Sequence, residues 1–494
     1  MPEPRKWQLT AGSAALGLAL AAVAVTAAGP WDSGQRTAER ARAAAPSAGG
    51  ARHAPPPAPA APHRPAPRRP APAPSAPGVL PALHAPAAAG RPADLAATLV
   101  PLLADPGLGP LRTASVVDTA TGTQLYGEGA GTPMTPASTV KIATVAAALS
   151  ALGPDHRIPT TVTDSADGRT VTLTGGGDPT LDPARLKRLA ADTARALTTR
   201  GHTAPVRLTY DTSLYEGPEL HPIGPNENLA PVTALMTREG RLDESSSGPA
   251  PRTSDPAGDT ATAFAAFLAA AGVKVTGAPT PAPDTGRAPK TAAAPKATAP
   301  KTTAAPKTGP LAVTHSAPLA DLAERTLTHS DNDLAEALAR QTAIAHQQPA
   351  SFEGAGKAVR DELAELGLPL AGARFADGSG LDRRDRVSAA LLTALLTRTA
   401  DPERPALRPV LTGLPIGGFT GTLAGRFDTA PATAGAGLVR AKTGTLTGVN
   451  TLAGTVVTAD GRLLAFAFLA GSTLSPYEAQ PALDRLSAAL ADRN

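Results

Sequence analysis

The sequence predicts a mixed α/β (α+β) domain whose sheet is built from both ends of the chain and which is interrupted by a smaller inserted domain. Strand-like runs lie around residues 114–126 and recur over residues 438–469. Helical patterns occupy much of the chain between them. A low-complexity stretch over residues 277–310, in which Ala-Pro-Lys recurs, is expected to be a surface insertion or linker.

Composition limits how much of the chain folds. The 494 residues allow two or three domains, but 53 prolines and 47 glycines leave part of the chain unable to form a core. Aromatic residues make up only 3%, so Leu, Val, Ile and Ala must supply the core. The absence of cysteine excludes disulfides and thiolate catalysis. Much of the excess behind the net charge of +4 lies in Pro/Ala-rich stretches, so no nucleic-acid partner is expected.

Residues 1–30 are predicted to be a membrane-targeting segment. Arg5 and Lys6 precede an uncharged apolar run over residues 9–28, which spans roughly 30 Å as a helix and is long enough to cross a bilayer. Small residues at 22–24 resemble a cleavage site, so the segment is either a signal anchor or a signal peptide. Both alternatives place the rest of the chain outside the cytoplasm. Residues 31–91, rich in Pro and Ala, are expected to form a disordered, extended tether.

Capping residues and apolar spacing predict the elements of the folded part. Asp94 is expected to cap a short helix that carries Leu95, Leu99, Leu102 and Leu103, and Thr121-Gly122 to turn the chain between two strands. Further helices are expected over residues 138–152 and 317–346 and around Leu483, Leu486 and Leu490, and C-terminal strands over residues 438–445, 450–458 and 463–469. The main domain is predicted to comprise residues 92–153 and 313–494, and the inserted domain residues 154–312.

The motif Ser138-Thr139-Val140-Lys141 stands at the start of one predicted helix. Residues three positions apart share a helix face, so the Lys141 amine reaches the Ser138 hydroxyl. A serine needs an adjacent base to attack a carbonyl, and lysine serves if its pKa falls from about 10.4 toward neutrality. Burial and a nearby like charge supply such a shift, which corresponds to about 4 kcal/mol. The motif alone is weak evidence, because a chain of this length contains about one by chance.

A second motif, Ser330-Asp331-Asn332, lies at the head of a helical stretch. Its hydroxyl suits proton relay to a leaving amine, and its amide suits a hydrogen bond to a peptide backbone. Such a triplet taken alone is more commonly a helix cap. The triplet therefore indicates a catalytic role only in combination with the motifs before and after it in the chain.

The third motif, Lys442-Thr443-Gly444-Thr445, lies on the first C-terminal strand. An ammonium and a hydroxyl on an edge strand suit a terminal carboxylate, and glycine allows a substrate backbone to approach closely. Lys307-Thr308-Gly309 repeats the tripeptide, but it lies between Pro306 and Pro310 and cannot form a strand. We therefore assign the motif to Lys442.

Taken in this order, the three motifs resemble those of the penicillin-recognising serine enzymes. Within that group the sequence is similar to the low-molecular-mass class C penicillin-binding proteins, the D-alanyl-D-alanine carboxypeptidase/endopeptidases. Further similar segments are residues 136–141, 173–181, 230–236, 330–336, 377–381 and 421–427. The resemblance covers about residue 94 to the end, apart from the Ala-Pro-Lys stretch.

The resemblance implies a penicillin-binding-protein/β-lactamase-like transpeptidase fold, with a smaller domain inserted between the Ser-x-x-Lys and Ser-x-Asn motifs. It implies that Ser138 is acylated, that Lys141 is its base and that Ser330 relays protons. Backbone N–H groups of Ser138 and Thr445 would form the oxyanion hole. The residues implied to bind substrate are Asn332, Lys442, Thr443, Gly444 and Thr445.

The implied substrates are peptidoglycan stem peptides in the cell wall, with β-lactam antibiotics as covalent inhibitors and with no metal or organic cofactor. The alternatives are a β-lactamase and a non-catalytic protein of the same fold that binds the wall or senses β-lactams. One departure from the family is Asp382-Arg-Arg-Asp385, where members more often carry Ser and Asn. Ser379, between two glycines, is expected to lie in a tight turn rather than to be a second nucleophile.

Overall fold

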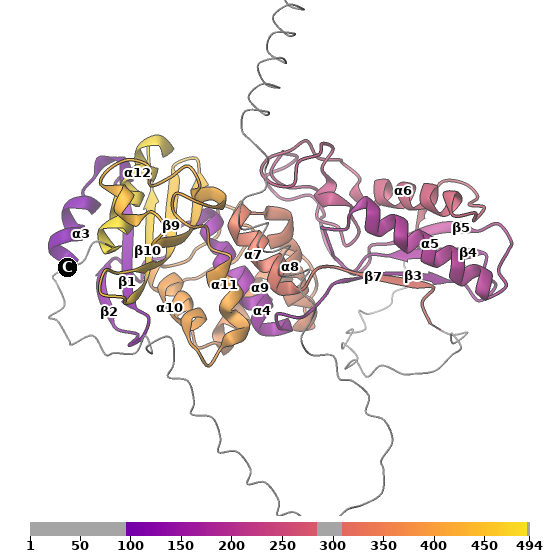
Figure 1. Ribbon diagram of the computed structural model, residues 1–494, viewed down its shortest axis with the longest axis horizontal. Coiled ribbons are helices and arrows are strands. Elements are labelled where there is room, and N and C mark those ends of the chain that lie inside the picture. The colour runs from indigo at the N-terminus through magenta and orange to yellow at the C-terminus, as the bar shows by residue number, and fades with distance from the viewer. Residues whose placement is uncertain (1–94, 284–308, 492–494) are drawn as a thin grey trace, which may run out of the picture. The chain divides into compact units, whose positions relative to one another are not determined.

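The computed structural model describes residues 95–283 and 309–491, which form two β-sheets with helices packed around them (Figure 1). The predicted targeting segment, the tether, Asp94 and Lys307 lie outside these residues. Within the two described ranges, no helix is both long enough and apolar enough to cross a membrane.

The first sheet joins the two ends of the described chain. Its strands follow the order β2-β1-β10-β9-β8, and each neighbouring pair is antiparallel. They are β1 (Leu111–Asp118), β2 (Gln124–Glu128), β8 (Val439–Leu446), β9 (Val449–Val457) and β10 (Leu463–Gly471). The predicted sheet from both chain ends, including its three C-terminal strands, is confirmed.

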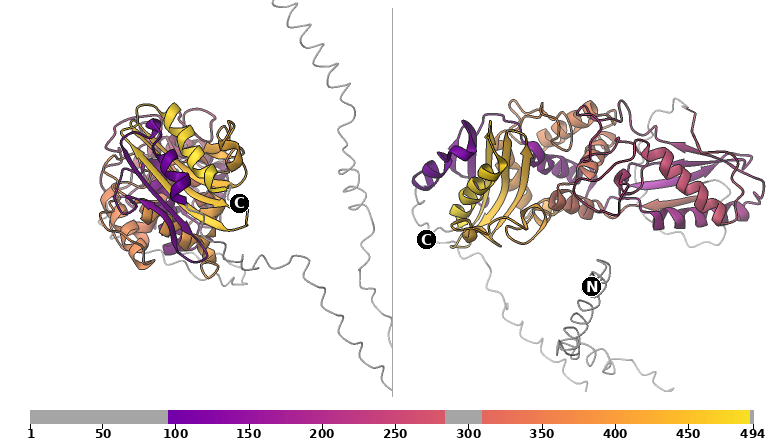
Figure 2. Two further views of the ribbon diagram at one scale, coloured as in Figure 1. Left: turned by 90° about the vertical axis from the view of Figure 1, so that its left-hand side faces the viewer. Right: turned by 90° about the horizontal axis from the view of Figure 1, so that it is seen from above.

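Helices cover both faces of this sheet (Figure 2). The helices α3 (Leu95–Leu103) and α12 (Pro476–Ala491) pack together on one face, and α10 (Ala389–Ala400) packs on the other. Side chains of β10 alternate between the two: Phe466 and Phe468 join the cluster with α12, whereas Ala467 joins the cluster with α10. Because both faces are covered, β10 is apolar almost throughout.

A helical body adjoins the sheet, with α4 (Lys141–Leu152) at its centre. The other helices of this body are α7 (Leu319–His329), α8 (Asn332–Ala345), α9 (Phe352–Glu365) and α11 (Arg408–Thr412). The α4 sequence is rich in alanine, so its neighbours approach it closely on all sides, and residues 141–149 are buried. The motif that begins at Ser138 thus leads directly into a largely buried helix.

The second sheet has its own apolar core. Its order is β6-β5-β4-β3-β7, with parallel pairs β4–β5 and β5–β6. Its strands are β3 (Pro159–Asp164), β4 (Thr170–Thr174), β5 (Arg207–Asp211), β6 (Thr280–Pro281) and β7 (Ala312–His315). The helices α5 (Pro183–Thr199) and α6 (Pro256–Ala270) pack on it. The inserted domain's limits stay a prediction, and the sheet itself extends to His315.

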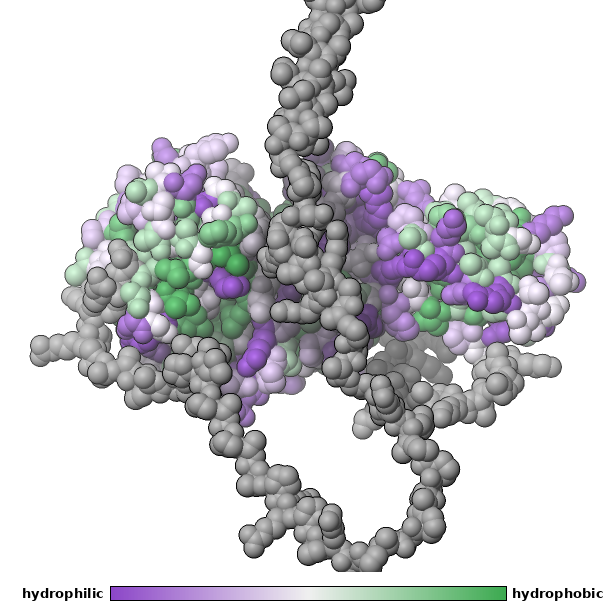
Figure 3. Space-filling view, in the orientation of Figure 1, coloured by the Kyte–Doolittle hydropathy of each residue, from purple (hydrophilic) through white to green (hydrophobic). Residues whose placement is uncertain are grey.

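Short 3-10 helices complete the described chain. They are η1 (Pro106–Leu108), η2 (Ala137–Val140), η3 (Arg238–Gly240), η4 (Pro405–Leu407), η5 (Gly421–Leu423) and η6 (Ala432–Gly435). Hydrophilic and apolar residues are interspersed over the visible face of the described parts (Figure 3).

Candidate active site

Ser138 lies in η2, which continues directly into α4 at Lys141. The helix predicted to begin at Ser138 is therefore present, but its first turn is tighter than an α-helix. The preceding residue, Ala137, has a φ of 48°, in the left-handed region that residues with a Cβ rarely adopt. Packing holds this conformation in place, because Gly380 lies against the Ala137 carbonyl so closely that a Cβ there would be 2.1 Å from the oxygen.

The buried Lys141 amine has three hydrogen-bond partners. Its Nζ lies 3.0 Å from Ser138 Oγ, 2.7 Å from Asn332 Oδ1 and 2.5 Å from the carbonyl oxygen of Ser379. Burial lowers the pKa of Lys141 to about 8, although nearby carboxylates, Asp377 foremost, act in the opposite direction. The structure thus brings Asn332 next to Ser138 and Lys141, although it lies 191 positions beyond Lys141 in the chain.

The second motif lies where two helices meet. Ser330 ends α7 with a φ of 58°, and Asp331 caps α8 by accepting a hydrogen bond from the backbone N–H of Leu334 at 3.0 Å. The helical stretch expected over residues 317–346 is therefore present as two helices, which the left-handed Ser330 separates. This break turns Asn332 toward Lys141, while Asn332 Nδ2 donates to the carbonyl of Asn228 at 2.9 Å. No hydrogen-bond partner of the Ser330 hydroxyl is found among the described residues.

The third motif lies on β8, an edge strand, as predicted. Lys442 is buried, and its Nζ donates to the Thr443 carbonyl at 2.8 Å. Thr443 Oγ1 lies 2.9 Å from Thr422 Oγ1, and Thr445 is exposed. Gly444 lies against β9 and against the chain just before Ser138, because a Cβ on it would lie 2.1 Å from Thr451 Oγ1 and 2.6 Å from the Pro136 carbonyl oxygen. β8 therefore packs directly against the turn that carries Ser138.

Residues 377–380 form a buried turn that completes the surroundings of Lys141. Asp377 accepts hydrogen bonds from the Ser379 hydroxyl at 2.9 Å and from the Gly380 N–H at 2.6 Å. Glu336 accepts from the N–H groups of Gly378 and Ser379 at 3.1 Å and 3.0 Å. The tight turn expected at Ser379 is confirmed, but its carbonyl contact with Lys141 was not foreseen. In the sequence, only the similarity of residues 377–381 to the family pointed to this turn. That similarity does not indicate which backbone oxygen faces Lys141.

The departure at Asp382 and Asp385 has a structural account. Asp382 pairs with Arg384, whose side chain bonds both carboxylate oxygens at 2.5–3.1 Å. Asp385 is buried, and its Oδ1 accepts from the Ala376 N–H at 2.6 Å. Burial and the neighbouring Asp377 charge raise the pKa of Asp385 well above its usual value, which favours the protonated form of this carboxyl group.

Two clusters of acidic side chains have metal-like spacing. In one, His221 Nδ1 accepts a hydrogen bond from the Ile223 N–H, so the proton of the imidazole is on Nε2. Nε2 therefore donates a hydrogen bond to Asp377 and has no lone pair to offer a metal. In the other, arginines neutralise the carboxylates of Glu239, Asp331 and Asp333. The neutralising arginines are Arg241, Arg252 and Arg325. Each cluster is thus already satisfied by protein groups.

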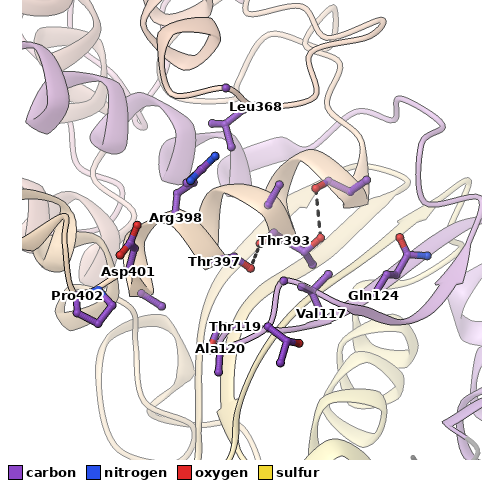
Figure 4. Close-up of a pocket in the computed structure, with 16 residues that line it drawn as sticks. Val117, Thr119, Ala120, Gln124, Leu368, Thr393, Thr397, Arg398, Asp401 and Pro402 are labelled. Atoms are coloured by element: carbon purple, nitrogen blue, oxygen red, sulfur yellow. Dashed lines mark hydrogen bonds between the residues drawn. The ribbon is translucent and has the colours of Figure 1, made fainter.

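A hollow of about 860 Å³ lies away from these groups (Figure 4). It is lined by the β1–β2 turn and by α10, including Gln124, Thr397, Arg398 and Asp401. Thr397 Oγ1 donates to the Thr393 carbonyl at 2.9 Å within α10. The three sequence motifs do not line this hollow. The candidate active site is therefore located by the side chains of these motifs and not by the size of a cavity.

Comparison with known proteins agrees with this geometry. A model of the D-Ala-D-Ala carboxypeptidase 3 (S13) family matches residues 95–251 and 244–490. The chain is 36% identical over 433 residues to Carboxypeptidase DacB of Mycolicibacterium smegmatis, covering 84% of this chain and 87% of that protein. It is 30% identical over 449 residues to the D-alanyl-D-alanine carboxypeptidase of an Actinomadura species, covering 78% and 82%.

Among solved structures, the chain resembles penicillin binding protein 4 of Haemophilus influenzae, with a TM-score of 0.60 at 21% identity, covering 76% of this chain and 95% of that one. A second structure of that protein is complexed with a β-lactam. The structural match bears out the predicted fold class, and the relatives and the family bear out the predicted enzyme class. The chain belongs to the D-Ala-D-Ala carboxypeptidase 3 (S13) family and is a serine-type D-alanyl-D-alanine carboxypeptidase.

Proposed function

We propose that the chain cleaves the terminal D-alanine from peptidoglycan stem peptides through an acyl-enzyme on Ser138. Ser138 Oγ attacks the carbonyl carbon of the penultimate D-alanine, the C–N bond breaks, and the proton from the hydroxyl reaches the leaving amine. Water then hydrolyses the ester and regenerates the serine. β-Lactams acylate the same oxygen and block the enzyme.

The arrangement of Lys141 carries this proposal. A neutral amine has two N–H groups and one lone pair, and two of the three partners of Lys141 are carbonyl oxygens that can only accept. The carbonyl oxygens of Asn332 and Ser379 occupy the two N–H groups, which leaves the lone pair for the Ser138 hydroxyl at 3.0 Å. A pKa near 8 makes the neutral form accessible close to neutral pH.

The remaining motif residues are proposed to bind the substrate. Asn332 holds the peptide backbone, and Ser330 relays the proton to the leaving amine. The terminal carboxylate binds at Lys442, Thr443, Gly444 and Thr445 on β8. The N–H groups of Ser138 and Thr445 stabilise the oxyanion, a contribution of about 3–4 kcal/mol for each donor in other enzymes.

We also propose that residues 1–30 carry the chain out of the cytoplasm and either anchor it in the membrane or are removed on secretion. The family's wall substrate supports an extracytoplasmic site of action. Membrane fractionation with and without alkaline extraction distinguishes the two forms: an anchored chain stays with the membrane, and a secreted chain is released.

Labelling with a fluorescent penicillin tests the site. The wild-type chain is expected to be labelled covalently, and Ser138→Ala is expected to lose the label. Ser150→Ala is a matched control, because Ser150 lies on the same helix α4 but outside the first motif. Equal labelling of Ser138→Ala and wild type would contradict the assignment.

Release of D-alanine from a diacyl-Lys-D-Ala-D-Ala peptide then measures the peptidase reaction. The wild type is expected to release D-alanine and to hydrolyse bound penicillin only slowly. Rapid release of hydrolysed penicillin would identify a β-lactamase, and labelling without peptide cleavage would identify a sensor.

A further inference from the structure

A loop between β5 and η3, here called the docking loop (residues 221–230), contacts the groups that hold Lys141. Although this loop belongs to the region predicted to be inserted, three of its residues bond to the helical body. His221 bonds to Asp377, the Asn228 carbonyl accepts from Asn332, and the Ala230 N–H donates to Asp333 at 3.0 Å. The docking loop therefore meets the same residues that surround the catalytic lysine.

His221 holds the turn that carries the Ser379 carbonyl. Its Nε2 lies 2.9 Å from Asp377 Oδ2, and the two side chains are only 1% and 0% exposed. The Ile223 N–H donates to His221 Nδ1 at 3.2 Å, which fixes the tautomer with the proton on Nε2. Phe352 packs edge-on against the imidazole at 5.2 Å, so the ring has a defined orientation.

Asp377 links His221 to the backbone of the turn at residues 377–380 through further hydrogen bonds. Besides the bonds from the Ser379 hydroxyl and the Gly380 N–H, it accepts from the Asp382 N–H at 2.8 Å. These bonds fix the peptide unit whose Ser379 oxygen lies 2.5 Å from Lys141 Nζ. Without the donor on His221, one oxygen of a buried carboxylate loses a charge-assisted hydrogen bond.

The docking loop also supports the other carbonyl partner of Lys141. The Asn228 carbonyl orients the Asn332 amide by accepting from Nδ2 at 2.9 Å, so that Oδ1 faces Lys141 at 2.7 Å. Both carbonyl oxygens that hold the lysine are thus supported from the same ten residues.

We propose that His221 is a positioning residue for the catalytic lysine: acting through Asp377 and the Ser379 carbonyl, it fixes Lys141 so that its lone pair faces Ser138. The proposal rests on the assignment of Lys141 as the base. On this proposal, the docking loop contributes to the geometry of the active site and does not merely connect the two halves of the catalytic domain.

The surrounding charges determine what a loss of His221 does to the pH profile. The groups facing Lys141 are Asp331, Glu336, Asp377, Asp385 and Lys442, and those facing His221 are Asp377, Glu336 and Asp382. The hydrogen bond from His221 offsets the effect of burial and helps to hold the pKa of Asp377 below its usual range. Removing this donor raises the pKa of Asp377, but the carboxylate still accepts hydrogen bonds from Ser379, Gly380 and Asp382, so it stays ionised near pH 8 and the pKa of Lys141 changes little.

The experiment measures acylation by a fluorescent penicillin in the full chain, separating the rate constant for acylation from non-covalent binding. His221→Ala and the bulkier His221→Leu both lack the donor, whereas His221→Gln retains an N–H near the position of Nε2. His346→Ala is the matched control, because His346 also bonds a carboxylate, Glu362, at 2.7 Å but has no contact with the Lys141 network.

We expect His221→Ala and His221→Leu to acylate about 100-fold more slowly than wild type with binding changed less than about threefold. The loss should be similar at every pH, with the pH midpoint of acylation close to that of wild type, and His221→Gln should recover most of the rate. A wild-type rate in His221→Leu would overturn the positioning role, as would an equal loss in His346→Ala. Absence of Ser138 labelling in the wild type would instead overturn the proposed function.

Discussion

Lys442 lies close enough to Lys141 for the two buried ammonium groups to repel each other. Burial first, and the positive charge of Lys141 second, lower the pKa of Lys442 well below its usual value. Both side chains are fully buried, and the Thr443 carbonyl is the hydrogen-bond partner of Lys442 among the described residues. An anion placed beside Lys442 would relieve this repulsion, and the terminal carboxylate of the substrate is such an anion.

Lys442→Met is expected to stabilise the fold while impairing the enzyme. A buried cation without a carboxylate partner destabilises the folded state, so the variant should gain about 1–2 kcal/mol in free energy of unfolding at neutral pH. It should lose on the order of 100-fold in kcat/KM for D-alanine release, because the substrate carboxylate loses its partner. Chemical denaturation and peptide kinetics measure the two effects.

The pH dependence of that stability gain has a defined sign. The folded-state pKa of Lys442 is lowered, so the unfolded chain binds its proton more tightly and the wild type gains stability as the pH rises toward the usual lysine value of 10.5. The advantage of Lys442→Met should shrink over the same range. Lys187→Met, at an exposed position on α5, should show neither effect. A destabilised Lys442→Met would mean that the ammonium has a stabilising partner.

Acylation is expected to accelerate as the pH rises through about 8. Lys141 acts as a base only when neutral, and burial sets its pKa at about 8, so the protonated and inactive form dominates below that pH. The rate of labelling by fluorescent penicillin should fall by about tenfold for each pH unit well below the midpoint. A rate that is flat or decreasing through this range would exclude Lys141 as the general base.

Gly444→Ala is expected to damage the site by steric overlap. The new Cβ would lie 2.1 Å from Thr451 Oγ1 and 2.6 Å from the Pro136 carbonyl oxygen, to which the hydroxyls of Thr451 and Thr139 both donate at 2.7 Å. Moving β8 away from the Ser138 turn should lower stability by about 1–3 kcal/mol and slow acylation. Thermal unfolding and labelling rate are the measurements.

Gly425→Ala is the control for this substitution, because nothing lies within 4 Å of the Cβ position at Gly425. It should leave labelling and the melting temperature close to those of wild type. Equal effects of the two substitutions would show that the contact between β8 and the Ser138 turn does not govern the site.

Elements with strong local patterns were predictable. The continuous apolar run of β10 and the Asp460-Gly461 turn that precedes it define that strand from the sequence, because a strand covered on both faces is nearly continuously apolar. The apolar spacing of residues 317–346 also predicted helix correctly on either side of Ser330. The cap at Asp331 agrees with the interpretation of Ser330-Asp331-Asn332 as the head of a helical stretch. The left-handed backbone of Ser330 was not predictable, because it is imposed by the junction of α7 with α8 and not by the local residue types.

The sequence by itself determined the chemical groups and their order: Ser138 with Lys141 one helical turn away, then Ser330 and Asn332, then Lys442 on an edge strand. Motif spacing within one element follows directly from helix and strand geometry. Only the tertiary structure decided what holds the lysine, since the contacts of Lys141 with Ser379 and of His221 with Asp377 join residues 238 and 156 positions apart. Contacts across such distances depend on the packing of whole elements, and no local pattern in a single sequence encodes them.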